Sequence, residues 1–193
     1  MKKTLTALTC LVLVAAACQK ASAPAPQGPT AEQCLGQSKF EKTMYKNDCL
    51  GITLKSSANF LFSQTMLANN PLFFSVPDFN YTLSIFVLNF ETPDINSDGN
   101  KTLFEAEVEK FFAQNLPYFK KMKAQYTNFG NVPSYYIAGS ESGIIEKYFF
   151  FKHNGVWAYL YMGAQEKEYN KANKDQAKLI KSIKFYTAEE AAQ

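Results

Sequence analysis

The chain has 193 residues, and all 20 of its basic residues other than the single histidine are lysines, against 17 acidic residues. Removing residues 1–17 takes away Lys2 and Lys3 and leaves 18 lysines against the same 17 acids, so the remaining part is nearly neutral. A nearly neutral domain without guanidinium groups lacks the basic excess and the bidentate donors of nucleic-acid binding proteins. We therefore expect no nucleic-acid partner.

The N-terminus is typical of an exported protein. MKK precedes an apolar run that is too short to span a bilayer and ends in small residues before Cys18, so residues 1–17 are interpreted as a signal peptide. VAAAC resembles a bacterial lipobox, although Ala15 replaces the usual leucine. The sequence therefore predicts lipidation at Cys18 and a membrane partner through that anchor. Cleavage at an ordinary signal-peptidase site, after Ala17 or at ASA, is the alternative.

A tether is predicted between the lipid and the folded part. Residues 18–29 contain QKASAPAPQGP, a proline-rich composition that favours an extended chain. Residues 30–193 then form one domain with enough chain for a real core. By the lipobox resemblance, Gln19 after the cysteine implies, as in enterobacteria, the periplasmic side of the outer membrane in preference to the inner membrane.

The two cysteines that remain in the exported domain, Cys34 and Cys49, are predicted to form a disulfide. Closing a loop of about 16 residues would contribute about 3 kcal/mol in the chain-entropy model. A metal or redox pair is disfavoured, because the spacing is not C-x-x-C and no histidine lies nearby.

Helices and strands are expected in a definite order. Thr30 and Gln33 form a capping box that predicts a short helix over residues 31–45. A helix with one apolar face is predicted over 102–116, continuing through 117–126, and an amphipathic helix that leads into a short strand over 170–186. Asn154-Gly155 predicts a hairpin turn. Strands are predicted at 50–54, 60–66, 71–77, 81–91, 134–141, 143–153 and 156–165.

This order, over about residues 50–186, resembles the PsbP and DcrB-like family of exported domains. The resemblance rests on YTLSIFVLNF, TLFEAEVEKFF, the pair GIIEKYFFFKHNGVWAYLYMGA, and AKLIKSIKF. It implies an α+β fold with an antiparallel sheet of about six strands and helices on both faces. Since known members are mostly accessory or binding proteins, it also implies a role in binding.

Catalytic signatures are weak. His153 precedes the Asn-Gly turn, where a histidine is expected to be solvated, and no nucleophile pairs with it. AGSESG has the glycine spacing of a nucleophile elbow, but Glu141 stands at the central position between Ser140 and Ser142. One histidine and two paired cysteines do not make a zinc site. We therefore expect that the protein is not an enzyme. The aromatic runs FF and YFFF, and Trp157, are assigned to the core in preference to a ligand site.

Residues 94–105, DINSDGNKTLFE, satisfy the calcium pattern D-x-[DN]-x-[DN]-G-x5-E at every specified position. In that pattern, alternating side chains converge on the ion, Gly99 takes a left-handed turn, and the last glutamate binds with both oxygens. The candidate ligands of a single, weak and structural Ca2+ site are Asp94, Asn96, Asp98, Asn100, Thr102 and Glu105.

The same residues have a simpler interpretation. Thr102 and Glu105 form a capping box, and Asp, Asn, Ser and Gly are common in any strand-to-helix loop. Lys101 and the lack of a second loop exclude an EF-hand pair. Both interpretations, a calcium loop and a capped turn, stay open from the sequence.

The function predicted is that of a non-catalytic binding or accessory module of the cell envelope with an envelope protein as partner. The alternative is a carrier that holds a small apolar or lipid ligand between the sheet and a helix. A deep apolar cavity would favour the carrier, whereas a filled core with exposed aromatic groups would favour a protein partner.

Overall fold

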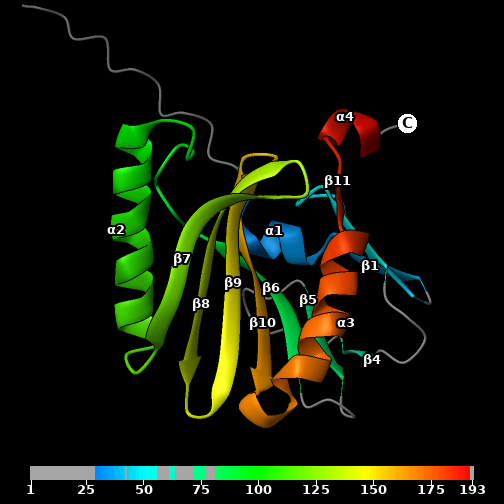
Figure 1. The fold of residues 1–193 in the computed structure, drawn as a ribbon. Helices are drawn as coiled ribbons and strands as arrows, with labels where there is room; N and C mark the ends of the chain where they lie inside the picture. Colours follow the sequence, from blue (N-terminus) through cyan, green and yellow to red (C-terminus); the bar gives the residue numbers. More distant parts are fainter. Residues whose placement is uncertain (1–28, 42, 56–60, 64–71, 77–80, 192–193) are drawn as a thin grey trace, which may run out of the picture.

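The computed structural model describes residues 29–41, 43–55, 61–63, 72–76 and 81–191 (Figure 1). The signal peptide, Cys18 and the tether through residue 28 lie outside these residues, so their predictions stay predictions. In the described part of the chain, no helix has the length and apolar character needed to cross a membrane.

Two antiparallel sheets and several helices form an α+β fold. In the described residues, the larger sheet has seven strands in the order β4-β5-β6-β10-β9-β8-β7, and the smaller has four in the order β1-β2-β3-β11. The larger sheet comprises β4 (Leu61–Ser63), β5 (Leu72–Val76), β6 (Tyr81–Leu88), β7 (Lys120–Phe129), β8 (Val132–Glu141), β9 (Ile144–His153) and β10 (Val156–Gln165). The smaller comprises β1 (Ser38–Glu41), β2 (Met44–Asn47), β3 (Ile52–Lys55) and β11 (Lys184–Phe185). The helices are α1 (Ala31–Leu35), α2 (Asp98–Asn115), a 3-10 turn (Glu166–Glu168), α3 (Tyr169–Ser182) and α4 (Ala188–Ala191).

Tight turns set the register of the central hairpins. Asn154 and Gly155 have φ values of 47° and 78°, and Ser142 and Gly143 have 50° and 78°. Two successive residues with positive φ match the twist of a two-residue hairpin, so β9 pairs with β10 along ten residues and with β8 along eight. The predicted Asn-Gly hairpin is confirmed.

Helices cover both faces of the larger sheet. Phe104, Val108 and Phe112 of α2 pack with alternate sheet residues, including Phe150 and Trp157. Ala172 and Leu179 of α3 pack on the other face. Because side chains alternate along each strand, the run Tyr148–Phe151 supplies rings to both layers, as the core interpretation of these aromatics requires.

The smaller sheet was not foreseen. The predicted helix over 31–45 ends at Leu35, and the next residues form the β1–β2 hairpin, which packs with β3 on the face that carries α3. The predicted capping box of Thr30 and Gln33 is present. Cys34 and Cys49 form the expected disulfide between α1 and the end of this hairpin.

A second difference concerns residues 117–126, which continue no helix. They lead into β7, the edge strand of the larger sheet. Leu116 leaves the helical conformation with φ −141° and ψ 63°, and Pro117 follows it in a turn. The chain therefore reverses and runs back along β8.

Candidate functional site

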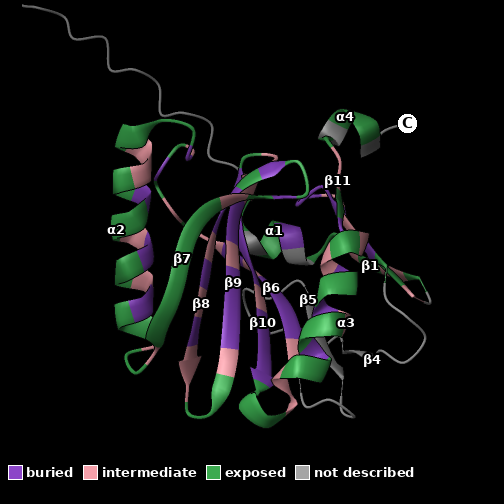
Figure 2. Ribbon diagram, viewed as in Figure 1, coloured by how far each residue is buried: buried purple, intermediate pink, exposed green. Residues whose placement is uncertain are grey.

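Strand β7 is exposed on both of its faces. Every residue from Lys120 to Tyr126 is exposed, and Met122 retains 68% of its accessible surface. Figure 2 shows β7 green along most of its length, whereas β9 and β10 are largely purple. Within the described chain β7 pairs only with β8, so the backbone groups along its outer edge face solvent. Such an edge is a template for another strand.

Contacts with α2 hold β7 in place. The register with β8 shifts between Lys121 and Lys123, which is a β-bulge. Beside it, the Lys121 ammonium forms an ion pair with the Glu109 carboxylate of α2, and this contact raises the pKa of Lys121. Further along, the Tyr126 hydroxyl donates to the Lys101 carbonyl at 3.4 Å. These two contacts connect β7 to α2.

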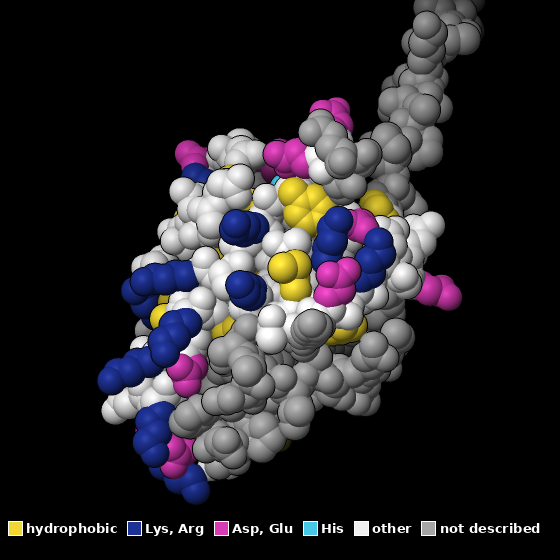
Figure 3. Space-filling model, turned by 90° about the vertical axis from the view of Figure 1, so that its right-hand side faces the viewer, with side chains coloured by type: hydrophobic (Ala, Val, Ile, Leu, Met, Phe, Trp, Pro, Cys, Tyr) yellow, Lys and Arg dark blue, Asp and Glu magenta, His cyan; other side chains and the backbone are white. Residues whose placement is uncertain are grey.

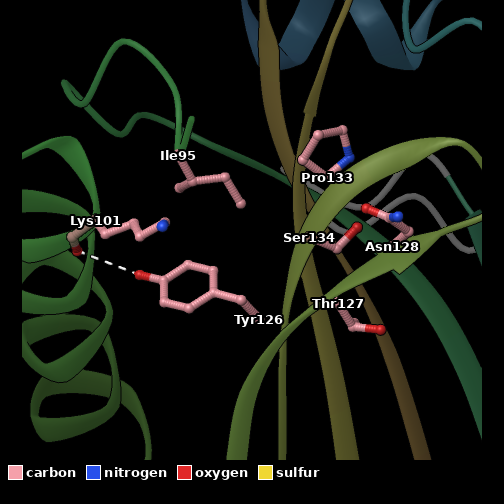
Figure 4. Close-up of a pocket in the computed structure, with 7 residues that line it drawn as sticks. All are labelled: Ile95, Lys101, Tyr126, Thr127, Asn128, Pro133 and Ser134. Carbon is pink, nitrogen blue, oxygen red and sulfur yellow. Dashed lines mark hydrogen bonds between the residues drawn. The ribbon is translucent and has the colours of Figure 1, made fainter. Parts of the chain in front are cut away.

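A cleft of about 400 Å³ opens between the start of α2 and the end of β7 (Figure 4). The Tyr126 ring points across it toward α2, and the Lys101 Nζ lies 5.4 Å from the centre of that ring. Burial and the nearby Glu105 carboxylate raise the pKa of Tyr126. The lining combines Ile95, Lys101, Tyr126, Thr127, Asn128, Pro133 and Ser134, and it is therefore mixed in polarity.

The segment before α2 is firmly held. The Glu107 carboxylate of α2 accepts hydrogen bonds from the backbone of Glu91 at 2.6 Å and from the backbone and hydroxyl of Thr92. The Trp157 indole donates to the Thr92 carbonyl at 2.7 Å, and its ring stacks on Phe104. Trp157 is thus a packing residue, as expected, and it ties the segment before α2 to β10.

The predicted calcium ligands do not converge in this structure. The Asp94 carboxylate accepts from the Asn96 backbone at 2.7 Å and from the Asn100 amide at 3.0 Å, and the first of these bonds is the main cause of its lowered pKa. Asp98 is exposed and pairs with Lys101 at 2.9 Å. Glu105 instead lies near Tyr126. No group of three or more metal-binding side chains occurs among the described residues.

The helix boundary explains this arrangement. The N-cap of α2 is Ser97, whose hydroxyl accepts from the Asn100 backbone at 3.3 Å, so Gly99 lies in the first helical turn and takes no left-handed conformation. Binding through all six predicted ligands would require this turn to unwind. Calcium binding by residues 94–105 stays a prediction.

The alternative capping interpretation named the wrong residues. Thr102 lies inside the helix, and its hydroxyl donates to the Asp98 carbonyl at 3.2 Å. The capping box of Thr102 and Glu105 is therefore replaced by the cap at Ser97, one turn earlier.

Two buried ionisable residues, absent from the predicted site, are neighbours on β9. Glu146 accepts hydrogen bonds from the Tyr148 and Tyr161 hydroxyls, both at 3.0 Å, and burial raises its pKa. Among the described residues no lysine forms an ion pair with it. The residues opposite Glu146 on the adjacent strands are Gly139 and Gly163.

These two glycines make room for rings beside Glu146. A Cβ at Gly163 would collide with the Tyr161 hydroxyl, and one at Gly139 would collide with the Phe119 ring. Tyr161 can therefore lean over its own strand and reach the carboxylate. The only sequence signal for this site is an ionisable pair, EK, inside an apolar strand.

Lys147 lies on the opposite face of β9, under α3. Its ammonium donates to Asn173 Oδ1 at 2.5 Å and Gln176 Oε1 at 3.2 Å, and it lies 4.8 Å from the centre of the Tyr169 ring. Burial lowers the pKa of Lys147 to about 8. Among the described residues, the amine connects the sheet to α3 through the neutral side chains of Asn173, Gln176 and Tyr169.

His153 and Ser142, which were considered for catalysis, take part in packing and in a turn. His153 is half-buried and not solvated as expected, because its Nε2 lies 2.9 Å from the Tyr186 carbonyl and its ring packs against Phe185. Ser142 lies in the β8–β9 turn, so AGSESG forms a hairpin end.

No family model matches the sequence, and no curated protein matches it. Solved structures are nevertheless similar. The solution structure of cyanobacterial PsbP (CyanoP) from Synechocystis sp. PCC 6803 has a TM-score of 0.56 with 7% sequence identity, covering 76% of this chain and 95% of that chain.

Two further structures show lower similarity. LpqN, described as involved in cell envelope biogenesis of Mycobacterium tuberculosis, has a TM-score of 0.44 with 15% identity, covering 68% of this chain and 81% of its own. A crystal structure from Bacteroides thetaiotaomicron VPI-5482 has a TM-score of 0.43 with 11% identity, covering 72% of this chain and 46% of its own. The similarity to CyanoP concerns the fold alone, and on that ground the chain has a PsbP-like α+β fold.

Proposed function

We propose that this protein is a non-catalytic binding module of the cell envelope, and that β7 is the strand by which it binds an extended segment of a partner protein. The observation that carries the proposal is the exposure of β7 on both faces and along its outer edge. A partner strand that adds to this edge would satisfy the free backbone groups and cover the exposed side chains.

The side chains of β7 define the chemistry of the partner. Lys120, Lys121 and Lys123 surround Met122, and the exposed Tyr118 lies just before the strand. This pattern suits a segment that carries acidic residues around an apolar one. The same lysines disfavour edge-to-edge aggregation of identical copies, because like charges along an edge oppose it. A different protein is therefore the occupant that we propose.

The cleft beside β7 offers a pocket for one side chain of that segment. Lys101 and Asn128 supply polar groups at its wall, while Ile95 and Tyr126 supply apolar surface. A side chain that projects from a strand paired with β7 would reach this cleft from the open side, so strand addition and the pocket together provide both affinity and specificity.

The packing of the core is the reason to prefer this proposal over a lipid carrier. Rings of α2, of the larger sheet and of the connection between α2 and β7 fill the space, for example Phe104 stacked on Trp157 at 4.9 Å and Phe112 stacked on Phe119 at 4.7 Å. A carrier would need an apolar cavity at this place. The positions of His153 and Ser142 support the proposal that the role is non-catalytic.

We place this module outside the cytoplasm, with Cys18 as its lipid anchor and the periplasmic side of the outer membrane as its location. The signal peptide, the lipobox-like VAAAC and the tether support this part of the proposal. The disulfide between Cys34 and Cys49 is consistent with an oxidising compartment.

Charge reversal along β7 tests the proposal. The full chain is affinity-purified from its native envelope as the parent, as Lys120→Glu/Lys123→Glu, and as a control, Lys55→Glu/Lys110→Glu, with the same change of net charge at exposed positions elsewhere. We expect a discrete protein that co-purifies with the parent and the control and is lost from the β7 variant. A set of co-purifying proteins that is the same for all three chains contradicts the proposal.

A further inference from the structure

The outer surface of α3 carries a regular series of lysines. Lys171, Lys174, Lys178 and Lys181 are all exposed, and at 100° per residue they fall within about 80° of arc over about 15 Å of helix. Lys167 and Lys184 extend the series at either end, and both are exposed. Figure 3 faces the side of the molecule that carries α3 and shows lysine side chains spread across it.

Few of these charges are neutralised within the molecule. Residues 166–184 contain six lysines and three acidic residues. Lys171 pairs with Glu168 at 3.5 Å and Lys178 pairs with Asp175 at 3.3 Å, while the two lysine side chains remain 71% and 79% exposed. In the described part of the chain, the other four lysines form no ion pair. A net positive helix surface therefore faces solvent.

The inner side of α3 fixes the orientation of this surface. Ala172, Gln176 and Leu179 are buried against the sheet and its neighbours. The Lys147 amine on β9 binds Asn173 and Gln176, which ties the helix to the sheet at its middle. Because α3 cannot roll without breaking these contacts, the lysine series is held on the outside.

The segment that contains α2 has the opposite charge. Residues 91–115, which include α2, contain six acidic residues and two lysines. Since α2 and α3 lie on different faces of the larger sheet, the nearly neutral domain has a charge asymmetry across its thickness (Figure 1). Such an asymmetry orients a protein near a charged surface.

From this arrangement we infer that α3 is the surface by which the domain lies on a membrane of anionic lipids. Lysine suits this role, because its strongly hydrated point charge interacts with a diffuse layer of headgroups, whereas the planar donors of arginine favour a fixed bidentate partner. The helix surface is convex, as expected for contact with a flat layer. This orientation would direct α2 away from the bilayer.

The test measures vesicle binding of the full chain. Partition coefficients are determined by flotation with vesicles of phosphatidylcholine alone and of phosphatidylcholine mixed with phosphatidylglycerol, and the readout is their ratio. The N-terminal segment contributes equally to every variant, so the ratio isolates the effect of the substituted lysines. The α3 variant replaces Lys171, Lys174, Lys178 and Lys181 by Gln. The control replaces Lys55, Lys110, Lys120 and Lys123 by Gln, also at exposed positions.

We expect the parent and the control to prefer the anionic vesicles and the α3 variant to lose that preference. At about fivefold for each of the four lysines near an anionic surface, the ratio should fall by about six hundredfold for the α3 variant and far less for the control. Raising NaCl from about 0.05 M to 0.5 M should reduce the parental ratio in the same direction. An equal loss in both variants, or no anionic preference in the parent, overturns the inference, and neither result affects the role proposed for β7.

Discussion

At the scale of single residues, Glu146 and Lys147 show what burial does to neighbouring charges. They follow one another on β9, so their side chains enter opposite layers. Glu146 is held by two tyrosine hydroxyls and Lys147 by two amides and a ring, and neither forms an ion pair in the described part of the chain. Both groups therefore make stability depend on pH.

The pKa of Lys147 defines the first dependence. Its pKa is about 8 in the folded protein against 10.5 ordinarily, so the unfolded chain binds more protons between these values. The contribution of the neutral Lys147 amine to stability is complete above 10.5, its pKa in the unfolded chain. It is lost as the pH falls through about 8, its pKa in the folded protein. We expect the free energy of unfolding of the parent to rise from pH 7.5 to 10 relative to that of Lys147→Met, in urea denaturation. A constant difference between the two proteins would show that the amine titrates normally.

Glu146 makes the free energy of unfolding depend on pH in the opposite direction. Burial raises its pKa above the ordinary 4.5, so the folded state binds its proton more tightly, and stability is lost as the pH rises through the folded pKa. Glu146→Gln keeps an oxygen for the Tyr148 and Tyr161 hydroxyls but does not titrate. The stability of this variant relative to the parent should therefore increase from pH 4 to pH 7. A decrease over that range would mean that the carboxylate is stabilised as an anion.

At the scale of elements, the first turn of α2 decides between the cap and the calcium loop. The structure places Ser97 at the N-cap and Thr102 in the helix. We expect Ser97→Ala to lower the free energy of unfolding by about 1 kcal/mol, because a backbone donor loses its partner. Thr102→Ala should cost little, since alanine favours the helix. If chemical denaturation gives the same loss of stability for both variants, Ser97 is not the N-cap of α2.

Calcium provides a separate test of the same turn. If residues 94–105 bind Ca2+, millimolar calcium raises the melting temperature, and Asp94→Ala abolishes that increase. Binding must also unwind the turn that Ser97 caps, so Ser97→Ala should enlarge the calcium effect. If calcium does not change the melting temperature of the parent, residues 94–105 form only the start of α2 and bind no calcium.

The parts of the fold whose buried residues recur at regular spacing could be predicted from the sequence. The long central strands and the buried residues of α2 carry a periodic signal, and the Asn154-Gly155 turn carries a dipeptide signal. The structure contains all three. β7 could not be recognised in the same way, because a strand exposed on both faces shows no alternation. Residues 117–126 were predicted instead to continue the helix over 102–116.

Other parts escaped prediction for different reasons. The β1–β2 hairpin is short and mixed in polarity, and the disulfide and the packing on β3 define it more than any local pattern does. The contacts of Glu146 depend on Gly139 and Gly163, which lie on other strands. Tertiary neighbours of this kind leave no signal in the local sequence.

At the scale of the whole molecule, the two surfaces have separate roles. The larger sheet presents an edge at β7 for a partner strand, and α3 presents a basic face on one side of that sheet. The lipid anchor proposed at Cys18 would keep both near the membrane. The central claim is that β7 binds a partner protein directly.

Site-specific photocross-linking in intact cells tests that claim most directly. A benzoylphenylalanine replaces Met122 on β7 or, as a control, Leu103 on the outer surface of α2, which is similarly exposed at 59%. After irradiation we expect one discrete cross-linked protein from position 122, its loss when Lys120→Glu/Lys123→Glu is added, and no such product from position 103. The absence of a product at position 122, or the same product from both positions, would contradict a binding edge at β7.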